Sequence, residues 1–241
     1  MPTDAEKRKR QMQEFITLAG VFEPPGKGNG RLATESILVF ITKWNRDLRI
    51  FDQEGVEIGA VRKSRGQYEL SDAERLCRVR RTYKSWLKIY FEFSVVGLDG
   101  AEIGTIGRQE QKMLYKHTPG LGRPPAIGRG DAAPRHAGPT ASDLESLAIK
   151  LRRPDGSTIA TLRDSQGGVV SRARSDQRRL YIEDEPGHEA ARLTYWQRPA
   201  FWGGYVLELQ PGLSEPLRTL IVATVLPVDK NIIDHGSDGG V

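Results

Sequence analysis

One short pattern recurs along the chain and constrains its fold more than any other feature. A turn that contains Asp and Gly is followed by an apolar residue, a small residue and a second apolar residue. The copies are Gly55-Val-Glu-Ile-Gly-Ala-Val61, Gly100-Ala-Glu-Ile-Gly-Thr-Ile106, Gly156-Ser-Thr-Ile-Ala-Thr-Leu162 and, more weakly, Gly187-His-Glu-Ala-Ala-Arg-Leu193. Because Asp and Gly favour tight turns with a positive φ, each copy predicts one β-hairpin.

The copies also indicate how the hairpins assemble. The acids that precede them are Asp52, Asp99, Asp155 and Asp184. Their spacing is too irregular for a propeller or a solenoid. The small residue inside each copy favours a bulge or a close approach between backbones. A meander that closes into a barrel removes its unpaired edges, and so the pattern predicts a closed antiparallel β-barrel.

Alternation of apolar and polar residues supports a mainly β protein. The longest run has apolar side chains at every odd position from Leu87 to Val95. Shorter runs of the same kind occupy 147–151 and 205–209. This period is typical of strands with one buried face and one wet face.

The last apolar run does not fit the alternation. From Leu220 to Val228 only Thr224 interrupts it. Its β-branched residues favour a buried strand, whereas Ser214 as a cap, followed by Glu and Pro in the first turn, favours a helix. Pro227 is expected to kink or end such a helix near Leu226.

The remaining segments lie outside the barrel prediction. Residues 6–19 are expected to form a short helix with one apolar stripe beside the basic run Lys7–Arg10. The predicted division is a basic N-terminal segment and flexible linker (1–31), one barrel domain (32–233) with a disordered Pro/Gly-rich insertion (117–142), and a disordered tail (234–241). The apolar stripe consists of Met12, Phe15, Ile16 and Ala19.

Charge is distributed unevenly although the net value is only +5. Residues 60–90 hold nine basic and three acidic residues, and residues 181–241 hold four basic and nine acidic ones. A positive side suits anionic partners. A single cysteine excludes an intramolecular disulfide, and no run of roughly 18 apolar residues is present to span a bilayer. We therefore expect a monomer in the cytoplasm, peripheral to the membrane if it binds one.

The sequence offers no catalytic or metal-binding constellation. None of the four histidines has the spacing of a zinc site, and no serine lies in a Gly-x-Ser-x-Gly context. Cys77 alternates with arginines and is expected to be a small core residue. We predict a protein that is not an enzyme and that has no cofactor and no metal.

The hairpin Ile50–Val61 resembles the repeated strand-turn-strand of the phospholipid scramblase and LURP-one-related families, which share the tubby C-terminal fold. A second match joins Leu193–Trp196, Tyr205–Leu209 and Ser214–Thr224, and it is similar to the closing strand and final helix of bacterial scramblase-like proteins. The resemblance spans about residues 32–233. It implies a barrel of about twelve strands around one apolar C-terminal helix.

Scramblase activity itself is not implied. Asp229 and Asp234 are too sparse for the acidic calcium segment of eukaryotic scramblases, and the final helix is too short to span. The hypothesis is instead a module that binds anionic phospholipid head groups through one basic face with aromatic residues, helped by the N-terminal helix at the interface. A nucleic-acid-associated protein and a passive interaction scaffold remain the alternatives. The predicted site consists of Arg78, Arg80, Lys84, Trp86, Lys88 and Tyr90.

Overall fold

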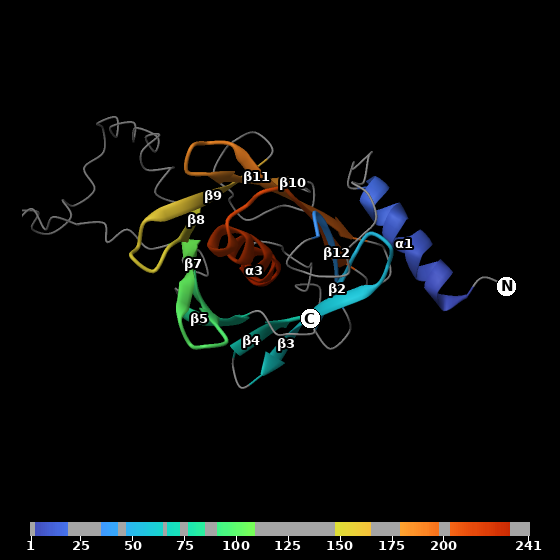
Figure 1. Cartoon of the computed structure of the whole chain (residues 1–241), viewed down its shortest axis with the longest axis horizontal. Helices are drawn as coiled ribbons and strands as arrows, with labels where there is room; N and C mark the ends of the chain where they lie inside the picture. Colours follow the sequence, from blue (N-terminus) through green and yellow to red (C-terminus); the bar gives the residue numbers. More distant parts are fainter. Residues whose placement is uncertain are drawn as a thin grey trace, which may run out of the picture.

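The computed structural model describes residues 3–18, 35–42, 47–64, 67–72, 77–84, 91–108, 148–164, 179–197 and 203–231. Twelve antiparallel strands form a closed barrel in which each strand pairs with its neighbour in sequence and β1 pairs with β12 (Figure 1). The predicted mainly β fold, with a closed barrel and a single C-terminal helix, is confirmed.

The strands follow one another along the chain without a crossover. They are β1 (Ile37–Thr42), β2 (Leu48–Phe51), β3 (Glu57–Ser64), β4 (Gln67–Ser71), β5 (Cys77–Lys84), β6 (Phe91–Gly97), β7 (Glu102–Arg108), β8 (Ile149–Arg152), β9 (Thr158–Asp164), β10 (Arg179–Asp184), β11 (Glu189–Gln197) and β12 (Gly203–Leu209). The helices are α1 (Asp4–Leu18) and α3 (Glu215–Asn231).

The repeated pattern forms four hairpins of one kind, as the sequence predicts. In each hairpin the glycine has φ between 79° and 88° and donates its N–H to the carbonyl three residues earlier. The pairing register then shifts by one residue beside the turn, which is a β-bulge. The aspartates serve two turn positions. Asp52 opens its turn and its carboxylate accepts from the N–H of Val56 at 2.8 Å, whereas Asp155 sits inside its turn and accepts from the N–H of Ser157 at 2.8 Å.

The small residue of the pattern is required by close backbones. A Cβ at Gly59 would lie 2.6 Å from the carbonyl oxygen of Ser71, and one at Gly104 would lie 2.1 Å from that of Arg152. Neither carbonyl can move without breaking the sheet. The predicted close approach is therefore present at both positions.

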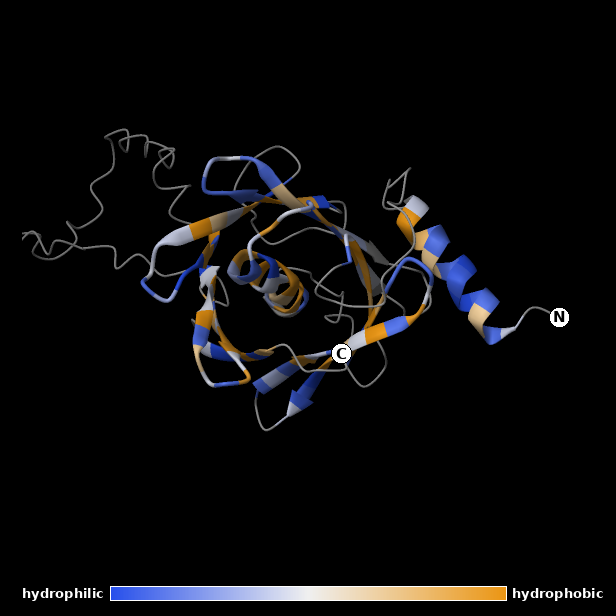
Figure 2. Ribbon diagram, viewed as in Figure 1, coloured by the Kyte–Doolittle hydropathy of each residue, from blue (hydrophilic) through white to orange (hydrophobic). Residues whose placement is uncertain are grey.

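Helix α3 fills the barrel. Figure 1 shows it inside the ring of strands, and Figure 2 shows hydrophobic residues on the helix and along the strands around it. Leu220, Ile221 and Val225 are at most 1% exposed and join one core with the inward side chains of the strands. A helix that is apolar on nearly every side needs such an enclosure.

The helix is longer than expected, because it continues past Pro227 to Asn231. The expectation that it would end near Leu226 is wrong, because it gave too much weight to the missing N–H of proline, whereas a kink at that position stays a prediction. Val228 is fully buried, and Asp229 accepts a hydrogen bond from the hydroxyl of Tyr205 at 2.8 Å. These contacts hold the last turn against β12 and offset the one backbone bond that proline removes.

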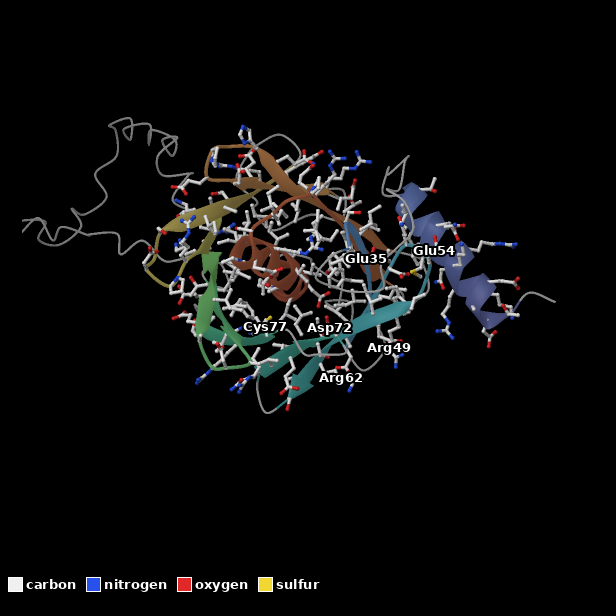
Figure 3. All side chains as sticks on the ribbon, in the orientation of Figure 1. Glu35, Arg49, Glu54, Arg62, Asp72 and Cys77 are labelled. Carbon is white, nitrogen blue, oxygen red and sulfur yellow. The ribbon has the colours of Figure 1, made fainter. Side chains whose placement is uncertain are left out.

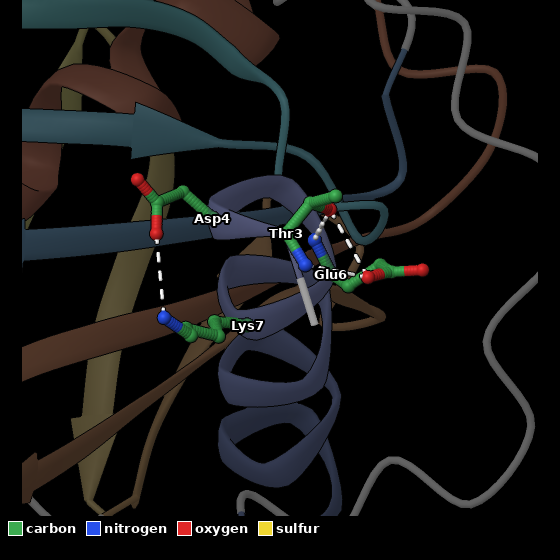
Figure 4. A network of polar contacts seen from close by, with 4 residues as sticks. All are labelled: Thr3, Asp4, Glu6 and Lys7. Carbon is green, nitrogen blue, oxygen red and sulfur yellow. Dashed lines mark hydrogen bonds and ion pairs between the residues drawn. The ribbon is translucent and has the colours of Figure 1, made fainter. Parts of the chain in front are cut away.

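Helix α1 begins with a capping box (Figure 4). Thr3 Oγ1 accepts from the N–H of Glu6 at 3.2 Å, and the Glu6 carboxylate accepts from the N–H of Thr3 at 2.6 Å. The predicted stripe is buried, with Met12 at 1%, Phe15 at 0% and Ile16 at 3% exposure. It packs on the outside of the barrel against Ile37, Val39, Ile41, Phe51 and Val206.

The two ends of the barrel differ, and we name them for what joins the strands there. The turn rim comprises 52–56, 97–101, 153–157, 184–188 and 210–214, the tight connections. The loop rim comprises the strand ends Thr42, Leu48, Ser64, Gln67, Lys84, Phe91, Arg108, Ile149, Asp164, Arg179, Gln197 and Gly203. Helix α3 enters at the turn rim and its last turn reaches the loop rim.

Some expectations fall outside the described residues. The predicted strand from Leu87 appears as β6 from Phe91, so that its first residues, Leu87 to Tyr90, are not described. The insertion 117–142, the tail 234–241 and the last part (19–31) of the N-terminal segment and linker, which includes Ala19 of the predicted stripe, also lie outside them.

Candidate anion-binding surface

The outer face of β5 carries the first part of the predicted site. Cys77 and Val79 are each 1% exposed and face the core, whereas Arg78, which lies between them, and Arg80, which follows Val79, are exposed. Side chains alternate across a strand, and so both arginines project outward. This placement agrees with the prediction for these two residues.

The second part of the predicted site is placed only at its edge. Strands β5 and β6 pair as an antiparallel hairpin, and Lys84 ends β5 opposite Phe91. Trp86, Lys88 and Tyr90 lie outside the described residues. The structure therefore brings Arg78, Arg80 and Lys84 onto one strand but does not join them to the two aromatic residues.

Neighbouring strands alter the surroundings of Arg78. Glu69 of β4 lies directly opposite it, and Arg62 of β3 lies opposite Glu69. Arg62 is exposed and lies at the periphery of the ring (Figure 3). Among the described residues, no carboxylate is within ion-pair distance of Arg62, Arg78 or Arg80. The sequence analysis missed Arg62. It follows Val61, a core residue, and because side chains alternate along a strand this position predicts an outward side chain.

Two further arginines face inward near the loop rim. The guanidinium of Arg81 lies 5.0 Å from the ring centroid of Phe93, a fully buried residue. Arg108 is only 8% exposed and pairs with Phe91 across β6 and β7. A cation over an aromatic face is favourable. The odd-numbered position of Arg81, in phase with Cys77 and Val79, already indicated this direction.

A buried polar cluster lies where α3 meets β12. Tyr205 is fully buried, its hydroxyl donates to Asp229, and its ring lies 5.3 Å from that of Tyr195. Burial raises the pKa of Tyr205 well above its usual value, and the nearby Asp229 adds to this effect. Burial raises the pKa of Tyr195 as well. Both phenols thus remain hydrogen-bond donors at neutral pH, which suits a structural role.

No described group is arranged for metal or nucleophilic chemistry. Within the described ranges, no three His, Cys, Asp or Glu side chains gather as a metal site would require. Burial raises the pKa of the Cys77 thiol to about 12, so it stays protonated and unreactive. His188 lies exposed in a turn, with Asp184 at 3.8 Å. No helix in the described part of the chain is both long enough and apolar enough to cross a membrane.

Charged residues separate along the barrel axis. Among the two outermost residues of every strand, the loop rim has seven Lys or Arg and two Asp or Glu. The turn rim has two Lys or Arg and six Asp or Glu by the same measure. The tight turns add Asp52, Glu54, Asp99, Asp155 and Glu185 on the acidic side and Arg153 on the basic side. An anionic surface is therefore matched by one end of the barrel and opposed by the other.

The fold and this surface define a closed antiparallel β-barrel that is filled by its own helix and carries a basic outer face on β5. Comparison with known families finds no matching family model, and comparison with curated proteins finds no match. Among solved structures, a protein from Arabidopsis thaliana is similar at 8% identity over 82% of this chain and 91% of its own, with a TM-score of 0.44. A likeness this distant carries no argument about function.

Proposed function

We propose that the protein is a non-catalytic, scramblase-like barrel that binds anionic phospholipid head groups reversibly at a membrane surface. One observation carries the proposal: Arg78 and Arg80 are exposed on the outer face of β5, with no carboxylate of the described residues within ion-pair distance. Arg62 extends this face onto β3. The interior is occupied by α3, whose Leu220 and Ile221 are fully buried, and so the barrel offers its surface rather than its centre to a ligand.

The strength of such a contact can be bounded. Each cation near an anionic leaflet contributes about 1 kcal/mol, so Arg62, Arg78 and Arg80 together supply roughly 3 kcal/mol. That is weaker than millimolar affinity, which needs about 4 kcal/mol. The sequence analysis assigned a second contact to α1, but its apolar stripe is packed on the barrel in this structure. Further cations must therefore take part.

Flotation with liposomes of graded anionic content tests the proposal. We expect wild-type binding to rise with anionic content and to fall with added salt, since the attraction is screened. The variant Arg78→Glu/Arg80→Glu should bind at least roughly tenfold more weakly. The matched control Lys7→Glu/Arg153→Glu makes the same charge change elsewhere, at the exposed Lys7 and the half-buried Arg153, and should bind within about twofold of wild type.

Three results would contradict the proposal. They are the absence of wild-type binding at low salt, binding that ignores anionic content, and equal loss in the two double variants. Competition by nucleic acid that displaces the protein from liposomes at equal charge concentration would favour the nucleic-acid alternative. Binding to neither would leave the passive scaffold.

A further inference from the structure

We infer that the barrel stands end-on against an anionic bilayer, with its loop rim toward the lipid and its turn rim away. The inference rests on the proposed function and adds to it the contact surface and its orientation. The partner of the loop rim is the head-group layer of a membrane, because an extended flat anionic surface can touch all sides of a ring at once. The outer face of β5 then lies beside the contact rather than at its centre: Arg80 lies nearer to the loop rim, whereas Arg78 lies at the turn-rim end of the strand.

The cations of the loop rim are spread around the ring. Lys63 on β3 and Arg179 on β10 are exposed, and Lys150 on β8 is half-buried. Around the ring β3 lies five strands from β8 and five strands from β10, whereas only β9 separates β8 from β10. A partner at one side of the barrel reaches either Lys63 or the pair Lys150 and Arg179, whereas a plane across the loop rim reaches all three. Arg49 and Arg163 belong to the same rim and form ion pairs with Glu57 at 2.6 Å and Glu183 at 3.4 Å.

The acids of the turn rim are held in place. Backbone N–H groups donate to the carboxylates of Asp52, Asp99, Asp155 and Asp184 at 2.7–2.9 Å. Hydrogen bonds from Ser157 lower the pKa of Asp155, because they stabilise its ionised form. The four carboxylates are therefore fixed in position at this end of the barrel. They would be repelled by an anionic leaflet, and the repulsion orients the barrel before any contact forms.

Two triple charge reversals distinguish end-on from side-on contact. Lys63→Glu/Lys150→Glu/Arg179→Glu alters the loop rim, and Arg62→Glu/Arg78→Glu/Arg80→Glu alters the side by the same charge. In flotation with anionic liposomes, the loop-rim variant should bind at least roughly 100-fold more weakly than wild type. The loss of affinity in the side variant should be at least about fivefold smaller than the loss in the loop-rim variant. A side variant that loses as much as the loop-rim variant, or more, overturns the orientation while leaving the proposed function standing.

A second measurement does not depend on charge changes. Ser64→Cys on the loop rim and Ser157→Cys on the turn rim are matched substitutions for a fluorescent label, and native Cys77 is 1% exposed and stays unlabelled. With bound liposomes that contain head-group quenchers, we expect the label at 64 to be quenched and the label at 157 to keep its free intensity. Equal quenching, or the reverse order, overturns the inference. Failure of the unlabelled wild type to bind overturns the proposed function and the inference together.

Discussion

Replacing Gly55 by alanine tests whether the barrel holds α1 through backbone contact. Gly55 has φ of 79°, and a Cβ there would lie 2.9 Å from the backbone nitrogen of Lys9 in α1. Helix backbone cannot rotate out of the way as a side chain can. Glu54, which lies beside α1 in Figure 3, also pairs with Lys9. The added methyl group must therefore displace α1 from its packed position on the barrel.

The magnitude follows from a matched pair of variants. Gly156 has φ of 84°, and a Cβ added there would meet no atom within 4 Å, so Gly156→Ala carries only the backbone strain, about 1–2 kcal/mol. Gly55→Ala carries the same strain and loosens the packing of Met12, Phe15 and Ile16. Full burial of each side chain is worth about 1.5–3 kcal/mol, and partial loss should add roughly 1–3 kcal/mol.

Thermal denaturation and amide hydrogen exchange measure the two parts separately. At about 2–4 °C per kcal/mol for a chain of this size, Gly55→Ala should melt at least roughly 2 °C below Gly156→Ala. Exchange within α1 should accelerate at least tenfold in Gly55→Ala and stay at the wild-type rate in Gly156→Ala. Equal melting temperatures together with unchanged exchange in α1 would refute the reasoning.

Three other substitutions probe the interior. Val222→Asp places an unpaired charge within α3 and should lower the free energy of unfolding by several kcal/mol, enough to unfold a typical domain; a melt within a degree or two of Thr219→Asp, at a partly exposed position of the same helix, would count against a central α3. Tyr205→Phe removes the donor to Asp229 and should cost about 1–3 kcal/mol in chemical denaturation, whereas no change would show that the bond is dispensable. For Cys77 the folded pKa is about 12 against 9.0 for the ordinary thiol, so its stabilising contribution is complete below pH 9 and is lost as pH rises through 12. The free energy of unfolding of Cys77→Ala should therefore change less between pH 9 and 12 than that of the wild type. Identical slopes of this free energy against pH would contradict the burial of the Cys77 thiol.

The sequence was most informative where local chemistry fixes geometry. The Asp and Gly residues of the four turns determine a positive φ, a bulge and the direction of the following strand, which is enough to define a meander. Closure followed from the need to remove edges. The identity of the interior element did not follow from its apolar residues, because β-branched residues such as Ile221 and Val225 suit a buried strand equally well. Only the cap at Ser214 and the resemblance to a known fold favoured the helix.

Long-range packing set the limits of the site prediction. The stripe of α1 was correctly located, but an amphipathic helix has the same pattern whether it faces lipid or the outside of a barrel, and here the outer side of β1 and β12 takes it. Similarly, Arg78 was correctly placed outward, yet Glu69, which lies opposite it on β4, becomes its neighbour only in the folded sheet. The axial separation of charge likewise needs the topology, since the acidic turns are distant from one another in sequence.

Because α3 lies inside a ring whose first and last strands are hydrogen-bonded to each other, the chain faces an ordering problem during synthesis. Ile37 in β1 cannot pair with Glu208 in β12 until β12 has been synthesised. The core remains empty until α3, which follows β12, has emerged from the ribosome. Before that point every finished hairpin presents an apolar face with nothing to cover it. Proteins with such non-local topologies fold slowly and expose aggregation-prone apolar surface before folding is complete. A nascent chain of this kind has particular need of chaperones, and translational stalling before residue 215 would leave an aggregation-prone intermediate.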